Sequence, residues 1–276
     1  MPAYGKRRAL GQHFLKDQAI CRLITSTLID EARKTGCKSI LEIGPGRGAL
    51  TSMILNSEYV SEFDEIVLCE RDRELAAIWR NQNIQALFRV EEGDFLDLPE
   101  DRWLTTEPIA VGSNLPYSAG TAILLRLAEH WRSIPVMVLM FQAEVARRLR
   151  AEPGSKSWGS LSLWIQNIWT VEKLSAVPAR AFAPPPDVES EVVILKPRDL
   201  PRIPDAASTE GAPLWRTLLK AAFSHRRKML RSGLPSGVLR NALDRSPVDG
   251  TKRAEQLNWE EWDSLYQTFR KISTNA

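Results

Sequence analysis

The stretch "LEIGPGRGALT" (residues 41–51) constrains the fold of this chain more than any other part of the sequence. An apolar run at 39–44 leads into alternate glycines that include Gly44 and Gly46, and a helical pattern follows at 48–56. Glycine permits a sharp backbone turn and the close approach of a ligand. A strand, a glycine loop and a helix in this order are typical of doubly wound α/β sheets, which bind ligands at the carboxyl ends of their strands.

The first two-thirds of the chain alternate between short apolar runs and helical patterns. Further strands are predicted at 65–70, 88–95, 109–114, 135–141 and 192–196, and further helices at 73–82 and 118–132. This alternation predicts an α/β fold with a mostly parallel sheet and crossover helices.

The pattern changes near residue 197, where proline, glycine and small polar residues predict a linker. Beyond it, apolar residues recur at helical spacing. Asn258, with Glu261 three residues later, predicts a capping box at the start of the last helix. We therefore predict a sheet domain at 1–198, a linker at 199–213 and a small helical domain at 214–276.

Charge and cysteine content limit the partners and the cellular compartment that we expect for this chain. The net charge of +3 permits a phosphate-bearing partner without demanding one, and basic residues cluster at 6–8, 147–150 and 225–228. The three cysteines form no CxxC pair, so we expect a reducing cytoplasm and no metal site. We expect no membrane attachment, because no apolar run approaches the roughly 20 residues of a membrane span.

Two ligands remain candidates for the glycine loop. Gly44-x-Gly46-x-x-Ala49 satisfies the dinucleotide fingerprint and so permits NAD. However, Pro45 removes an N–H that a pyrophosphate would need, and Glu42 would repel phosphates. Glu42 instead suits a ligand with positive charge, and S-adenosylmethionine carries a sulfonium and an ammonium group but no phosphate.

Two further carboxylates close the next predicted strands. Glu70 can accept hydrogen bonds from two ribose hydroxyls, a feature that NAD and S-adenosylmethionine sites share. Asp94 can accept a hydrogen bond from an adenine amino group. Since parallel strands end at one edge of a sheet, we expect both carboxylates near the glycine loop.

The stretch "VGSNLPYSAG" (111–120) ends another predicted strand with unusual residues. If the ligand is S-adenosylmethionine, these residues face the acceptor, and an exocyclic amine of a nucleobase fits them. The side-chain oxygen of Asn114 and the carbonyl of Leu115, held extended before Pro116, can accept from the two N–H groups and orient the amine for in-line attack. Tyr117 offers a flat face for a flipped-out base.

A second aromatic wall is predicted at Phe182, which shortly precedes Pro184-Pro185-Pro186. Prolines stiffen a loop and reduce the entropic cost of holding the ring in place. Packing of the same ring in the core is the alternative.

The chain resembles the KsgA/RsmA family of small-subunit (16S) ribosomal RNA adenine N6,N6-dimethyltransferases over nearly its whole length. The Asn-Leu-Pro-Tyr, Pro-Pro-Pro-x-Val-x-Ser and Phe-x-x-Arg-Arg-Lys motifs are the most specific. The matching stretches are "GQHFLKD" (11–17), "LEIGPGRGALT" (41–51), "CERDRELA" (69–76), "EGDFLDL" (92–98), "SNLPYSAGTAILLRL" (113–127), "FQAEVARRL" (141–149), "FAPPPDVESEV" (182–192) and "AAFSHRRKMLRSGL" (221–234).

The resemblance implies a class I S-adenosylmethionine-dependent methyltransferase fold with a C-terminal helical domain, and a role for each site residue. His13, Leu15, Glu42, Gly44, Gly46, Glu70, Asp94 and Asn114 would bind the cofactor. Asn114, Leu115, Pro116, Tyr117 and Phe182 would form the catalytic site, with Tyr117 and Phe182 sandwiching the target base. Many relatives carry Asn in place of His13.

The resemblance also implies the substrate and the partner. The family dimethylates two adjacent adenines in a hairpin near the 3′ end of 16S ribosomal RNA, within an assembling small subunit. Arg147, Arg148, Arg226, Arg227, Lys228 and Arg231 would help to hold this RNA. The chain would act as a cytoplasmic monomer in ribosome biogenesis.

Three alternatives stay open at the level of sequence. One is a resistance methylase of large-subunit RNA that shares the Asn-x-Pro-Tyr motif. Another is an assembly or transcription factor for which methylation is secondary. The third is a NAD-dependent oxidoreductase.

Overall fold

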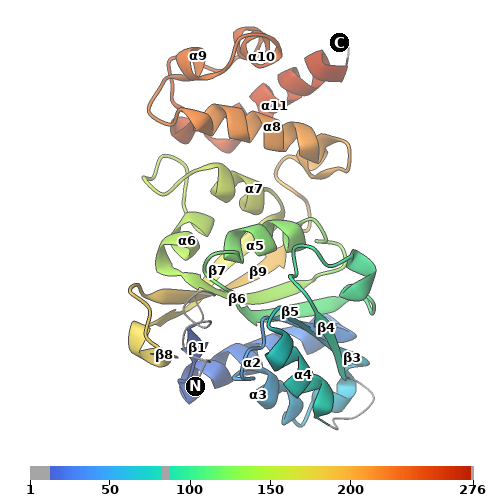
Figure 1. Cartoon of the computed structure of the whole chain (residues 1–276). Coiled ribbons are helices and arrows are strands. Elements are labelled where there is room, and N and C mark those ends of the chain that lie inside the picture. The colour runs from blue at the N-terminus through green and yellow to red at the C-terminus, as the bar shows by residue number, and fades with distance from the viewer. Residues whose placement is uncertain (1–12, 83–87, 275–276) are drawn as a thin grey trace. The chain divides into compact units, whose positions relative to one another are not determined.

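The computed structural model describes residues 13–82 and 88–274 (Figure 1). The described chain divides into two compact units, one formed by 13–146 with 171–197 and the other by 147–170 with 198–274. This grouping differs from a single boundary at residue 198, because residues 147–170 fold with the C-terminal helices.

Within the described residues, the first unit is built on a seven-stranded sheet in the order β4-β3-β2-β5-β6-β9-β7 (Figure 1). The strands are β2 (Ser39–Ile43), β3 (Glu65–Glu70), β4 (Phe88–Glu92), β5 (Ile109–Asn114), β6 (Val136–Gln142), β7 (Trp169–Val177) and β9 (Ser190–Pro197). β2 to β6 pair in parallel, whereas β9 is antiparallel to β6. The predicted α/β fold with a mostly parallel sheet is confirmed. β7 was not predicted, because most of its residues are only partly buried and it carries no long apolar run.

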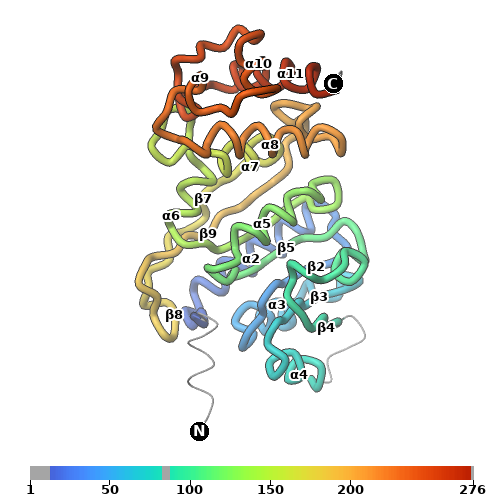
Figure 2. The backbone as a smooth tube through the Cα atoms, turned by 45° about the horizontal axis from the view of Figure 1, so that its top comes forward, coloured from blue at the N-terminus to red at the C-terminus, as the bar shows by residue number. Residues whose placement is uncertain are grey.

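The helices of this unit are α2 (Gln18–Lys34), α3 (Thr51–Leu55), α4 (Arg73–Asn81) and α5 (Gly120–Ala128), while α6 (Ala143–Leu149) contains the boundary between the units. Asp17 begins α2 by accepting hydrogen bonds from the first turn, and Asp72 does the same for α4. α2 packs against β5 (Figure 2), where Gly112 provides the space. A Cβ atom at Gly112 would lie 2.3 Å from Cδ2 of Leu28.

A short two-stranded sheet joins the N-terminal segment to a loop far along the chain. β1 (Phe14–Leu15) pairs antiparallel with β8 (Phe182–Ala183), as Figure 1 shows. In this register Leu15 lies opposite Phe182. The backbone N–H of Lys16 continues this contact by donating to the carbonyl of Ala181 at 2.8 Å.

The second unit is helical. It contains α7 (Ser160–Ile168), α8 (Gly211–Ser224), α9 (Leu230–Gly233), α10 (Val238–Arg245) and α11 (Trp259–Thr274). Trp215 packs edge-on against Trp262 and Tyr266 in its core. The predicted capping box is confirmed, because Asn258 and Glu261 exchange backbone-to-side-chain hydrogen bonds of 3.1 and 2.9 Å.

The segment expected to be a linker is packed into this second unit. Ile203 is buried, and its N–H donates to Oδ1 of Asn167 at 2.7 Å. A short 3₁₀ helix, Pro204–Ala207, follows, and α8 begins at Gly211. None of the helices in the described parts of the chain is both long and apolar enough to cross a membrane.

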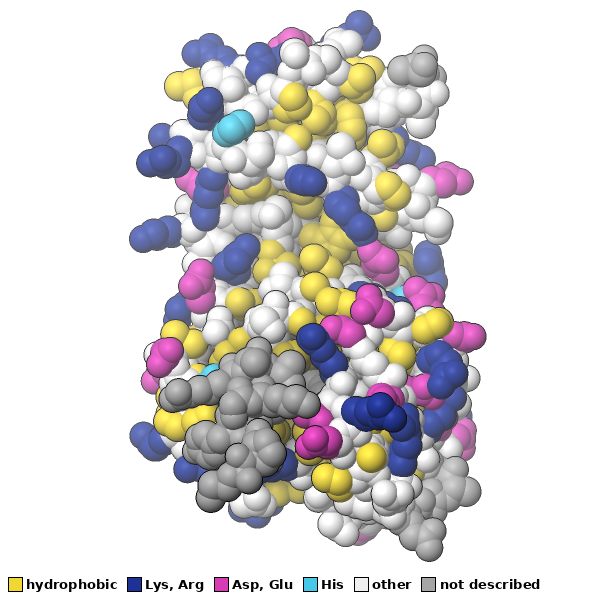
Figure 3. Space-filling view, viewed as in Figure 1, with side chains coloured by type: hydrophobic (Ala, Val, Ile, Leu, Met, Phe, Trp, Pro, Cys, Tyr) yellow, Lys and Arg dark blue, Asp and Glu magenta, His cyan; other side chains and the backbone are white. Residues whose placement is uncertain are grey.

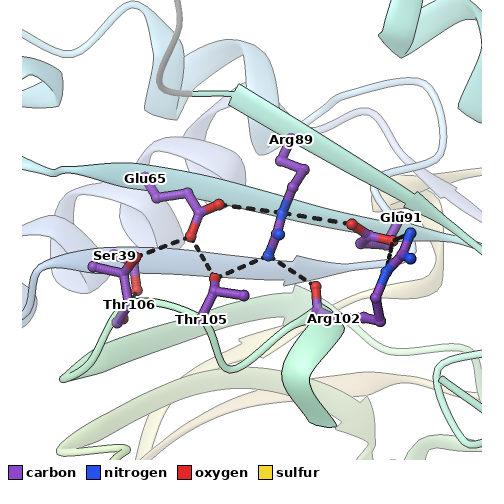
Figure 4. A network of polar contacts seen from close by, with 7 residues as sticks. All are labelled: Ser39, Glu65, Arg89, Glu91, Arg102, Thr105 and Thr106. Atoms are coloured by element: carbon purple, nitrogen blue, oxygen red, sulfur yellow. Dashed lines mark hydrogen bonds and ion pairs between the residues drawn. The ribbon is translucent and has the colours of Figure 1, made fainter. Parts of the chain in front are cut away.

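A network of ion pairs fastens the outer strands of the sheet (Figure 4). Arg89 on β4 lies 3.1 Å from a carboxylate oxygen of Glu65 on β3, and Thr105 donates to Glu65. Arg102 donates two hydrogen bonds to the buried carboxylate of Glu91, at 2.6 and 2.9 Å. The fold therefore supplies both carboxylates with positively charged partners.

Candidate functional site

The carboxyl ends of β2, β3 and β5 open on a cavity in the first unit. The sequence-predicted residues that line it are His13, Leu15, Glu42, Gly44, Gly46, Glu70, Asp94, Asn114, Leu115, Pro116 and Tyr117. The fold thus gathers at one edge of the sheet residues that lie more than 100 positions apart in the sequence.

The glycine loop has a conformation that only glycine adopts easily. Gly44 and Gly46 have φ angles of 69° and 56°, in the left-handed region. A Cβ atom at Gly46 would lie 3.1 Å from the ring of Phe14. The loop is held in place at Gly46, whose N–H donates to Glu70 at 2.9 Å and whose carbonyl accepts from the indole of Trp79 at 3.0 Å.

Two buried carboxylates border the cavity without a positively charged partner. Glu42 is 2% exposed, and Oγ1 of Thr51 donates to it at 2.7 Å. Glu70 is 4% exposed and accepts from the N–H groups of Gly46 and Asp72. Within the described chain, neither carboxylate forms an ion pair with Lys or Arg.

Burial shifts the pKa of both groups upward. It raises the pKa of Glu42 to about 8, an effect that the Thr51 hydrogen bond opposes and the charge of Glu70 reinforces. Burial likewise raises the pKa of Glu70, opposed by the N–H donors of Asp72 and Gly46. A cationic ligand in the cavity would stabilise the ionised form of both carboxylates.

Asp94 also lines the cavity. Its Oδ1 accepts from the N–H of Leu96 at 3.1 Å, and its Oδ2 lies 3.3 Å from a guanidinium nitrogen of Arg71. Arg71 lines the cavity as well, although no sequence motif predicted it. Only its place directly after Glu70 could have indicated this.

The Asn-Leu-Pro-Tyr turn lines the cavity as well. Nδ2 of Asn114 lies 3.5 Å from the carbonyl oxygen of His13, which leaves the amide oxygen of Asn114 as an acceptor. The Tyr117 hydroxyl is hydrogen-bonded to Oγ of Ser190 at 2.6 Å, so its ring is held from β9. Burial raises the pKa of this hydroxyl, and the Ser190 hydrogen bond opposes the change.

Comparison with known proteins identifies the family. A profile described as "Ribosomal RNA adenine dimethylase" matches residues 4–271. The chain is 39% identical to "Ribosomal RNA small subunit methyltransferase A" of Thermosynechococcus vestitus, over 98% of both chains. It is 40% identical to the protein of the same name from Acaryochloris marina, over 94% of this chain and 95% of the relative.

The chain belongs to the ribosomal RNA adenine dimethylase family.

Solved structures agree on the fold. A dimethyladenosine transferase from Plasmodium falciparum superposes with a TM-score of 0.71, at 24% identity over 95% of this chain and 98% of the other. The 23S rRNA methyltransferase ErmE superposes with a TM-score of 0.60, at 22% identity over 93% and 99%. The predicted methyltransferase fold with a C-terminal helical region is therefore confirmed.

One ring expected at the site of this family member lies elsewhere. Phe182 is 1% exposed, packs in the hydrophobic core and does not line the cavity. Its strand, β8, pairs with β1, which turns the side chain inward opposite Leu15. In this structure the ring has the core packing that the sequence left as the alternative, and its place against a target base stays a prediction.

The basic residues expected to hold RNA fall into two groups. Arg226 is already bound within the second unit, because it donates to Glu255 at 2.6 Å and to the carbonyls of Lys156 and Trp158 at 2.5 and 3.0 Å. Arg147 on α6 and Arg227, Lys228 and Arg231 at or before α9 are exposed, as Arg226 is, whereas Arg148 is half-buried. Figure 3 shows Lys and Arg side chains along the left edge of the part that holds α8 and α9. The Lys6–Arg8 cluster lies outside the described residues.

Proposed function

We propose that this chain is a ribosomal RNA adenine N6,N6-dimethyltransferase that uses S-adenosylmethionine. Its target would be two adjacent adenines in the 3′-terminal hairpin of 16S ribosomal RNA, in the assembling small subunit. The observation that carries the proposal is one cavity lined both by two buried carboxylates, neither of them ion-paired within the described residues, and by the Asn114–Tyr117 turn.

The residues at the strand ends fit S-adenosylmethionine better than a dinucleotide. Glu42 and Glu70 suit a cationic, hydroxyl-bearing ligand, and they would oppose a pyrophosphate. Glu70 would accept from the ribose hydroxyls and Asp94 from the adenine amine, while Gly44 and Gly46 allow close approach to the backbone. His13 and Leu15 remain predicted contacts from the family resemblance. When bound, S-adenosylmethionine supplies the methyl group.

The turn after β5 would prepare the acceptor. The Asn114 side-chain oxygen and the Leu115 carbonyl would accept from the two N–H groups of adenine N6 and aim its lone pair. Tyr117 would stack on the flipped-out base, and such stacking offsets part of the cost of removing the base from its helix. The proton on N6 leaves after methyl transfer, so no general base is needed before attack.

The second unit would add contacts to ribosomal RNA. The exposed cations Arg147, Arg227, Lys228 and Arg231 are the candidates for phosphate contacts. The proposal includes a monomer that works in the cytoplasm, in keeping with three cysteines that are buried and free.

The decisive experiment is transfer of labelled methyl groups to small subunits from a strain that lacks this methylation, followed by mapping of the label. We expect label on two adjacent adenines near the 3′ end, none on large subunits, and labelling that is about 100- to 1,000-fold slower with Asn114→Ala. Label on large subunits alone would contradict the proposal. Calorimetry provides a second test, since tight binding of NAD with no binding of S-adenosylmethionine would also contradict it.

A further inference from the structure

One arginine fastens the loop that carries Asp94 (residues 93–98, the Asp94 loop) to a helix. Arg126 on α5 donates hydrogen bonds to the carbonyl oxygens of Phe95 and Leu98. Asp94 and Phe95 both line the cavity. We propose that Arg126 is a positioning residue, which holds the Asp94 loop so that the cavity binds adenine in preference to a base without the 6-amino group. The inference rests on the proposed function, in which Asp94 accepts a hydrogen bond from that amine.

Arg126 is a half-buried cation whose positive charge meets no carboxylate. Within the described residues, no Asp or Glu forms an ion pair with it. Its guanidinium carbon instead lies 5.0 Å from the ring centroid of Phe95 and 5.6 Å from that of Trp103. Because aromatic faces attract a guanidinium and its planar fork reaches two acceptors at once, the rings and the two carbonyls together fix its position.

The helix gives Arg126 a firm base. Ile123, Leu124 and Leu127, on the same helix, are each at most 2% exposed. Ile123 lies one turn before Arg126 and also lines the cavity. Since close-packed side chains hold a helix in place, the bonds from Arg126 fix the Asp94 loop relative to a wall of the cavity.

Bonds within the Asp94 loop shape it but do not set its place. The N–H groups of Asp97 and Leu98 donate to the carbonyl of Asp94 at 2.9 and 3.1 Å, which closes a turn. Asp94 is placed by bonds on either side of it. The N–H of Gly93 donates to the last carbonyl of β3 at 3.0 Å, and Arg126 binds the carbonyl that follows Asp94.

A hydrogen bond selects between ligands only when its geometry is held narrowly. The carboxylate of Asp94 can accept from the amine of adenine, whereas hypoxanthine has a carbonyl oxygen at that position, and two acceptors repel each other. A loop free to move would withdraw from that carbonyl and so avoid the repulsion. Loss of the Arg126 bonds should therefore reduce the preference for adenine.

The test measures this preference on the full chain by calorimetry. Its probes are S-adenosylhomocysteine, which methyl transfer leaves behind, and S-inosylhomocysteine, whose base is hypoxanthine. We expect the unmodified protein to bind the first about 100-fold more tightly or better. Arg126→Leu keeps an apolar stem beside the rings but has no donor, so it should lower this ratio about 10-fold. Arg126→Lys restores the charge and a donor, and its ratio should lie between the two.

Two controls separate positioning from a general loss of stability. Glu91, three residues before Asp94, accepts two hydrogen bonds from Arg102 and does not line the cavity. Glu91→Gln should therefore lower the melting temperature and keep the full ratio. Asp94→Ala should bring the ratio close to one, and adding Arg126→Leu should not change it further, because both substitutions remove the same contact.

Three results would overturn the inference: a full ratio in folded Arg126→Leu, an equal fall in Glu91→Gln, or a further fall when Arg126→Leu is added to Asp94→Ala. If Arg126→Leu does not fold, an unchanged ratio in Arg126→Lys overturns it. Equal binding of both probes by the unmodified protein would also overturn it, while methyl transfer to small subunits would still support the proposed function. Binding of neither probe would instead contradict the proposed function.

Discussion

Two groups of buried carboxylates belong to the same sheet and differ in what neutralises them. Glu91, 4% exposed, is paired with Arg102 and Arg89 in the network of Figure 4. Glu42 and Glu70 are equally buried at the cavity, and within the described residues no cation pairs with either. The charge of Glu91 is neutralised by arginines of the same chain. Neutralising Glu42 and Glu70 requires a bound proton or a cationic ligand.

The same contrast appears among other side chains. Asn167, in the second unit, has its oxygen and its amide nitrogen bound to the backbone of Ile203. Asn114 faces the cavity, and its oxygen accepts no hydrogen bond from the described residues. Groups that the fold satisfies stabilise the structure, and groups that it leaves open at a cavity indicate function. Four experiments test this distinction.

The largest effect is expected for the two asparagines. Asn114→Ala should lower methyl transfer to small subunits about 100- to 1,000-fold, as removal of one preorganised polar group at a reacting centre does. Asn167→Ala should retain the rate but lose about 1–3 kcal/mol of unfolding free energy, because a buried N–H and a carbonyl lose their partners. Single-turnover rates and urea denaturation measure both. Equal loss of activity in the two variants would contradict the distinction between Asn114 as a functional residue and Asn167 as a structural one.

The next effect concerns the carboxylates themselves. Glu70→Gln should weaken S-adenosylmethionine binding about 100-fold, because the amide accepts through one oxygen only and has lost the charge. Glu91→Gln should leave that affinity unchanged and lower the unfolding free energy by about 2 kcal/mol, since Arg102 loses a charged acceptor. Calorimetry and chemical denaturation give the two quantities. A loss of S-adenosylmethionine affinity in Glu91→Gln would mean that the ion-pair network of Glu91 also contributes to binding of the cofactor.

The pH dependence of stability tests the unpaired state of Glu42. Its pKa is raised to about 8 in the folded protein, above the usual value near 4.5, so the folded chain retains a proton that the unfolded chain releases between these values. The unfolding free energy of the ligand-free protein should therefore fall as pH rises through this window, by up to about 1.4 kcal/mol per pH unit.

Glu42→Gln provides the control for that slope. The amide that this substitution introduces keeps an oxygen that can accept from Thr51, but it cannot ionise. Between pH 6 and pH 8, the unfolding free energy of the variant should therefore fall by about 2 kcal/mol less than that of the unmodified protein. Denaturant titrations at pH 6, 7 and 8 measure both proteins. Parallel curves would mean that Glu42 is already ionised in the folded state.

The sequence predicted what depends on local pattern. The glycine loop and the strand ends carrying Glu42, Glu70 and Asn114 follow from apolar runs and turn residues close in the chain. Contacts between aromatic rings from distant parts of the chain cannot be predicted from such local patterns. His13 meets Tyr117, and Phe182 is turned into the core, because β1 pairs with a strand 168 residues away. No spacing rule places such distant segments together.

The smallest expected effect compares two adjacent arginines. Arg226 is bound to Glu255 and to two carbonyls, whereas Arg227 is exposed and makes no ion pair with a described residue. Arg227→Gln should weaken binding to small subunits a few-fold and reduce the slope of log Kd against log salt concentration by about 1, as loss of one phosphate contact requires. Arg226→Gln should leave that slope unchanged and instead lower the melting temperature, because the turn that contains Lys156 and Trp158 loses its donor. The opposite result would be a smaller salt slope in Arg226→Gln and an unchanged slope in Arg227→Gln. It would mean that Arg226 leaves its partners within the protein to bind RNA, and it would contradict the distinction between side chains that are bound within the fold and side chains that are free to bind a ligand.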